Sequence, residues 1–130
     1  MDTIIDGHTH IFPPEVKKKR EKYASRNQSF RLLYEDPRAR LAGREELLTA
    51  MDAHGVQRAV ISGFPWEDVG LCRWHNDYLL ESARETEGRL IPFACVSSKN
   101  PRQSRAEIHR ALSLGMRGVG EIAHYAADDL

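Results

Sequence analysis

Four short apolar runs are spaced along the chain. They span residues 3–6, 57–64, 89–97 and 116–123. The third run is nearly continuous in apolar residues, as expected of a strand that is covered on both sides of a sheet. The pattern therefore predicts four short strands.

Before each of the last three runs, apolar residues recur at helical spacing. Residues 44–54 show this spacing and are followed by Gly55, a typical helix stop. Residues 68–87 open with Asp68, a residue type that caps helices. A third segment begins at Ser104 and ends at Gly115. Each segment predicts a helix that packs its apolar face on the sheet.

The connection after the first strand is longer and more polar. Pro13 and Pro14 are suited to the first turn of a helix, so residues 15–25 are predicted to form a surface helix. Residues 27–43 contain the breaker Asp36-Pro37 and are predicted to be a loop. The resulting order β-α-β-α-β-α-β predicts an α/β fold with parallel strands and right-handed crossovers, in a single domain over residues 1–130.

Composition narrows the class of protein. The chain has 130 residues with 19 basic and 19 acidic side chains, a balance that favours neither nucleic acid nor anionic lipid as a partner. No apolar run approaches the roughly 20 residues needed to cross a bilayer. The two cysteines do not make a disulfide framework, and no export signal is visible, so we expect a cytoplasmic protein.

The first strand ends in two histidines. Side chains at positions i and i+2 of a strand share one face, so His8 and His10 are expected to project together. They lie at the C-terminal end of the strand, where parallel sheets build their sites. Imidazole is a good ligand for zinc and related metals. The pair therefore predicts part of a metal site that needs further ligands.

Other residues at the same edge are candidates for the site. Glu121 ends the fourth strand between small neighbours and is a candidate third ligand. Trp66, which follows the second strand, and His124, which follows Glu121, are candidate substrate contacts. His75 and His109 fall within the central helices, away from the strand ends, and are expected to be structural or solvated.

These segments together resemble a known family. The segments are IIDGHTHIFPPE, GVQRAVISGFPW, RLIPFACVS and GMRGVGEIAHY, and they are similar to the amidohydrolase superfamily, more narrowly to its amidohydrolase-related branch of metal-dependent TIM-barrel hydrolases and decarboxylases. The resemblance implies a divalent metal, zinc first with manganese as the alternative, bound by His8, His10 and Glu121. It also implies a small-molecule substrate.

The resemblance implies more chain than is present. A (β/α)₈ barrel takes about 250 residues, so the sequence is expected to form strands 1–4, the first half of a TIM-type barrel, and to stop after the fourth strand. Hydrolysis of an amide, ester or lactone is the favoured activity, and nonoxidative decarboxylation of an aromatic or unsaturated acid is the alternative. A non-catalytic half-barrel that self-associates into a homo-oligomer through its open edges also stays open.

Overall fold

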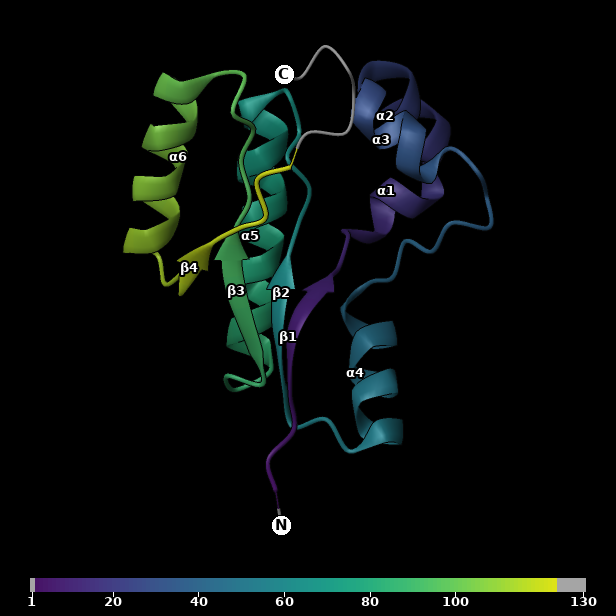
Figure 1. Cartoon of the computed structure of the whole chain (residues 1–130), viewed down its shortest axis with the longest axis vertical. Helices are drawn as coiled ribbons and strands as arrows, with labels where there is room; N and C mark the ends of the chain where they lie inside the picture. Colours follow the sequence, from purple (N-terminus) through teal and green to yellow (C-terminus); the bar gives the residue numbers. More distant parts are fainter. Residues whose placement is uncertain (1, 124–130) are drawn as a thin grey trace.

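Four parallel strands form the centre of the fold. The computed structural model describes residues 2–123, and its strands lie side by side in the order β1-β2-β3-β4 (Figure 1). The elements in chain order are β1 (Ile5–His10), α1 (Pro14–Lys18), α2 (Arg20–Arg26), α3 (Gln28–Tyr34), α4 (Arg44–His54), β2 (Arg58–Ser62), α5 (Val69–Glu85), β3 (Leu90–Ala94), α6 (Pro101–Ser113) and β4 (Gly118–Val119). The predicted α/β fold with parallel strands is confirmed.

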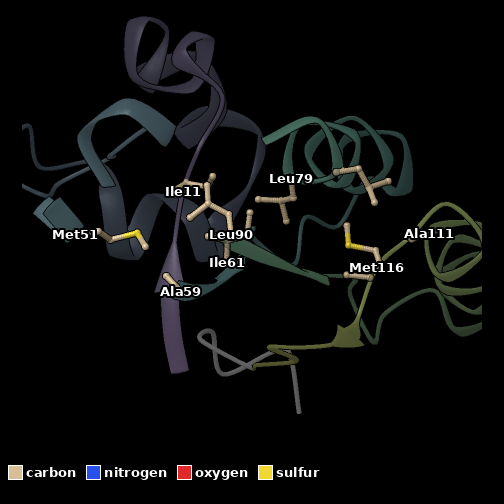
Figure 2. Close-up of a cluster of buried hydrophobic side chains, with 10 residues drawn as sticks. Ile11, Met51, Ala59, Ile61, Leu79, Leu90, Ala111 and Met116 are labelled. Carbon is tan, nitrogen blue, oxygen red and sulfur yellow. The ribbon is translucent and has the colours of Figure 1, made fainter. Parts of the chain in front are cut away.

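One face of the sheet packs against helices α4, α5 and α6. Figure 2 shows the buried cluster at this face, with Ala59 and Ile61 of β2 and Leu90 of β3 directed toward the helices. Met51 of α4 and Leu79 of α5 meet them from the helical side. Burying a leucine, isoleucine or methionine side chain such as these stabilises the fold by about 1.5–3 kcal/mol. This cluster fixes where the C-terminal ends of the strands lie.

The alternating residues on the other face are less buried. Val60, Ile91 and Phe93 are only partly buried, and β1 is exposed over most of its length. Ile4 and Ile5 leave half or more of their surface in water. Within residues 2–123 the sheet therefore has one covered face and one open face, and His8 and His10 share the open face.

A second, aromatic cluster lies beyond the C-terminal ends of the strands. Helices α1, α2 and α3 contribute Val16, Tyr23 and Phe30 to it, and the segment after β2 contributes Phe64 and Trp66. The rings of Phe30 and Trp66 lie 5.0 Å apart, and those of Phe64 and Trp66 lie 4.9 Å apart. This cluster anchors the long connection between β1 and α4 next to the strand ends.

The prediction of a loop over residues 27–43 is wrong in its first part. Residues Gln28–Tyr34 form α3, because the side chain of Asn27 accepts a hydrogen bond from the backbone N–H of Phe30 and Phe30 is fully buried. The predicted helix over residues 15–25 is divided into α1 and α2 at Lys19. It is also less superficial than expected, because Val16, Tyr23 and Ala24 are buried.

The remaining boundaries differ by smaller amounts. Helix α6 begins at Pro101, earlier than Ser104, because proline is well suited to the first helical turn. Strand β4 comprises only Gly118 and Val119 of the predicted run 116–123. Helix α5 is capped by Asp68 as predicted, and α4 ends at the left-handed Gly55 as predicted. No helix within residues 2–123 is long and apolar enough to cross a membrane.

Candidate metal centre

His8, His10 and Glu121 come together at the C-terminal edge of the sheet. The Nε2 atoms of the two histidines are 2.9 Å apart. A carboxylate oxygen of Glu121 lies 3.1 Å from Nε2 of His8 and 3.9 Å from Nε2 of His10. One possible ligand atom from each residue lies within 4.8 Å of the others. The structure therefore brings all three side chains together at one edge of the sheet, and their role as metal ligands stays a prediction.

His10 is held by the chain that follows β2. Its Nδ1 lies 2.9 Å from the carbonyl oxygen of Gly63. A carbonyl oxygen only accepts hydrogen bonds, so Nδ1 of His10 has to be the protonated nitrogen. In the neutral ring this leaves the lone pair on Nε2, the atom that faces His8 and Glu121. Gly63 therefore selects the tautomer that presents Nε2 as a ligand.

His8 lies in the irregular part of the pairing between β1 and β2. The register of the two strands shifts between Asp6 and Thr9. Because Nε2 of His10 is an acceptor in the neutral ring, Nε2 of His8 is the atom that donates between the rings. The same nitrogen lies beside the Glu121 carboxylate. The side chain of His8 is 62% exposed and that of His10 is 27% exposed, so His10 is the better fixed of the two.

Glu121 is positioned through its backbone. The backbone N–H of Gly120 donates to the carbonyl oxygen of Ala94 at 2.9 Å, which continues the pairing beyond β4. The thiol of Cys95 donates to the carbonyl oxygen of Glu121 at 3.0 Å. Burial raises the pKa of this thiol well above its usual range, so Cys95 stays protonated and able to donate. These contacts link the third candidate ligand to the end of β3.

The donor set fits a divalent metal ion. Two imidazole nitrogens and one carboxylate oxygen are ligands that zinc accepts at about 2.0–2.2 Å. The possible ligand atoms of the three side chains lie within 4.8 Å of one another, and the two nitrogens are 2.9 Å apart. A set of three protein ligands with one open position is the usual arrangement of catalytic zinc.

Of the two predicted substrate contacts, Trp66 and His124, only Trp66 lies within the described residues. Trp66 is fully buried, and its indole N–H donates to Nδ1 of His75 at 3.0 Å. Its complete burial among aromatic rings gives no support to the prediction that it contacts a substrate. His124 lies outside the described residues, so its predicted contact with a substrate stays a prediction.

The positions of two residues near the site were not predicted from the sequence. Tyr34 of α3 lies close enough to Glu121 for that carboxylate to raise the pKa of its hydroxyl, in addition to the larger effect of burial. His75 is structural, as expected, but its predicted position away from the strand ends is wrong, because its ring contacts Gly63 directly after β2. A loop prediction concealed Tyr34, and the even helical pattern of residues 68–87 gave no sign of the contact made by His75.

Comparison with known proteins places the chain in a family. The sequence model of a family described as amidohydrolase matches residues 5–130, which is nearly the whole chain. The chain belongs to the amidohydrolase family. None of the curated proteins compared with it matches.

The fold of this amidohydrolase chain is also found in a solved structure. A crystal structure of a "putative amidohydrolase" from Staphylococcus aureus matches with a TM-score of 0.62 and 18% sequence identity, covering 93% of this chain. The chain spans 38% of the length of that protein. Its four parallel strands therefore correspond to part of an amidohydrolase barrel, in agreement with the resemblance found in the sequence.

Proposed function

We propose that this amidohydrolase chain contributes His8, His10 and Glu121 to a metal-dependent hydrolase. Its substrate would be a small molecule with an amide, ester or lactone bond, and zinc is the preferred metal. The observation that supports the proposal is the approach of two histidine Nε2 atoms and one carboxylate within 4.8 Å at the open mouth of the sheet. Family membership supports the same chemistry.

Each of the three candidate ligands would have its own role in the metal centre. His10 would bind the metal through Nε2, because the carbonyl of Gly63 holds its proton on Nδ1. His8 would bind through Nε2 once the proton on that nitrogen moves to Nδ1 or is released. Glu121 would supply a negatively charged oxygen and offset part of the metal's charge. A divalent metal held there would act as a Lewis acid toward the substrate carbonyl group and toward water. The partial exposure of all three side chains leaves room for a substrate beside them.

Hydrolysis by the zinc-loaded chain tests this proposal. Because the chain spans only 38% of the length of a related protein, we expect slow but zinc-dependent hydrolysis within a panel of aryl esters, lactones and anilides, abolished by a chelator and restored by zinc. Glu121→Gln keeps the shape of the side chain but removes its charge, so it should lower the rate, whereas Glu87→Gln at an exposed turn should not. Hydrolysis that survives the chelator, or zinc-dependent release of CO₂ from aromatic acids without any hydrolysis, would contradict the proposal.

A further inference from the structure

A buried histidine of another element, His75 of α5, contacts the backbone segments that surround His10. This inference rests on the proposed metal-binding role of His10. Two backbone segments set the position of the His10 ring. One is the chain at the end of β1 that continues into Ile11, and the other is Gly63, which accepts the hydrogen bond from Nδ1. His75 of α5 contacts both of these segments.

The first contact is a hydrogen bond. Nε2 of His75 lies 2.7 Å from the carbonyl oxygen of Ile11, the residue after His10. On the other side of the ring, Nδ1 lies 3.0 Å from the indole nitrogen of Trp66, which can only donate. Nδ1 of His75 is therefore the acceptor and Nε2 is the donor. Both ring nitrogens have a partner, so one tautomer and one ring orientation are fixed.

The second contact is steric. A Cβ atom added to Gly63 would lie 3.0 Å from Cδ2, Cγ and Nε2 of His75, which is closer than side chains normally approach. The imidazole ring therefore lies directly against the backbone of Gly63, and only glycine fits without displacement. His75 is 1% exposed, so the ring has little space into which it can withdraw. Moving Gly63 would move the carbonyl group that orients His10.

We propose that His75 is a positioning residue for the metal centre, acting on His10 through Ile11 and Gly63. Its ring contacts the backbone at Ile11 and at Gly63 and holds these two segments at a fixed spacing. This spacing keeps Nε2 of His10 directed toward His8 and Glu121. Burial lowers the pKa of His75 to about 4, so the ring is neutral at ordinary pH and keeps this hydrogen-bonding pattern. Partners of this kind, outside the metal ligands, commonly change metal affinity by about 10- to 100-fold when they are replaced.

The experiment compares two glycine positions and one double variant. Gly63→Ala places a methyl group against His75. In the matched control Gly7→Ala, the new methyl group meets no atom of residues 2–123 within 4 Å, although Gly7 also lies beside a candidate ligand. We expect Gly63→Ala to weaken Co²⁺ and Zn²⁺ binding by about tenfold or more and Gly7→Ala to leave it within about twofold. His75→Ala should weaken binding to a similar extent.

The double variant distinguishes a positioning role of His75 from a nonspecific disturbance of the fold. Removing the imidazole ring makes room for the new methyl group, so Gly63→Ala should add little further loss in a His75→Ala background. His75→Gln, which keeps a polar side chain, provides the same comparison if His75→Ala does not fold. Full additivity of the two substitutions in folded protein would overturn the proposal, as would unchanged metal affinity in His75→Ala.

A second readout needs no metal. The ¹⁵N spectrum of the His10 ring in the metal-free protein, recorded well above the ordinary pKa of histidine, should show the tautomer protonated at Nδ1. Gly63→Ala and His75→Ala should shift it toward a mixture, and Gly7→Ala should not. A wild-type chain that binds no metal would overturn the proposed function, while this spectrum would still decide the role of His75. An unchanged His10 spectrum in both variants would contradict that role.

Discussion

At the scale of single residues, the burial of His75 links stability to pH. Burial lowers its pKa from the ordinary 6.5 to about 4, and nearby His10 has a smaller effect in the same direction. Between these two pH values the unfolded chain binds a proton at this position and the folded chain does not. The free energy of unfolding therefore falls as the pH drops from 6.5 toward 4, and this contribution is fully present above pH 6.5.

We predict that His75→Gln reduces this pH dependence. A shift of this size corresponds to roughly 3 kcal/mol between neutral and acid pH, at about 1.4 kcal/mol per pKa unit. The measurement is urea unfolding of the wild type and the variant at neutral pH and near pH 4, the lowered pKa of His75. The other titrating groups are the same in both proteins, so the difference between the two losses reports on His75. The variant will be less stable at neutral pH, and its loss on acidification should be smaller. An identical loss in the two proteins would show that His75 does not titrate as described.

Residue patterns were sufficient to find the three candidate ligands. Side chains at positions i and i+2 of a strand share one face, which predicted that His8 and His10 project together. Parallel strands end at the same edge of the sheet, which predicted that Glu121 lies near them, as it does in the structure. Their binding of a metal stays a prediction. The contacts of His75 were not visible in the sequence, because Ile11 lies 64 positions away and nothing local distinguishes a buried histidine in a helix from a solvated one.

At the scale of elements, α3 is the part of the fold that the sequence concealed. Polar residues and Asp36-Pro37 dominate the segment that contains it. The helix exists because Asn27 caps it and Phe30 is buried against Phe64 and Trp66. Two of these partners lie more than thirty positions further along the chain, so tertiary packing, rather than local propensity, determines this element.

We predict that Asn27→Ala destabilises the fold by about 1 kcal/mol, because it leaves a backbone N–H of α3 without its cap. Asn100→Ala is the matched control, because Asn100 is also an N-cap residue but its side chain makes no capping hydrogen bond. Its cost should be within about 0.5 kcal/mol. Chemical denaturation measures both. Equal losses for the two substitutions would show that the cap of α3 does not contribute as described.

At the scale of the whole molecule, the sheet is covered on one face and open on the other. The open face combines the partly buried Val60, Ile91 and Phe93 with the candidate metal ligands. Along its first edge, Ile4 and Ile5 are 50% and 53% exposed, and Ile122 after β4 is 54% exposed. Exposed strand edges of this kind readily pair with another chain, and exposed apolar side chains favour association.

We therefore predict that the 130-residue chain self-associates in solution. Light scattering at micromolar concentration should give a mass of at least twice the 14.8 kDa of one chain. Ile5→Lys places a charge on the exposed edge and should shift the population toward monomer, whereas Leu33→Lys on the distant α3 should not. A monodisperse monomer of the wild type, with cooperative unfolding, would contradict the prediction.

The central claim is that His8 and His10 bind a divalent metal, and zinc binding by purified variants tests it most directly. The measurement is the zinc affinity of the metal-stripped wild type, His8→Ala, His10→Ala and His109→Ala, in which His109 is an exposed histidine on α6. We predict about one zinc ion per wild-type chain, a loss of about tenfold or more in each of the first two variants, and no change in the third. Equal zinc affinity in all four proteins would contradict the account.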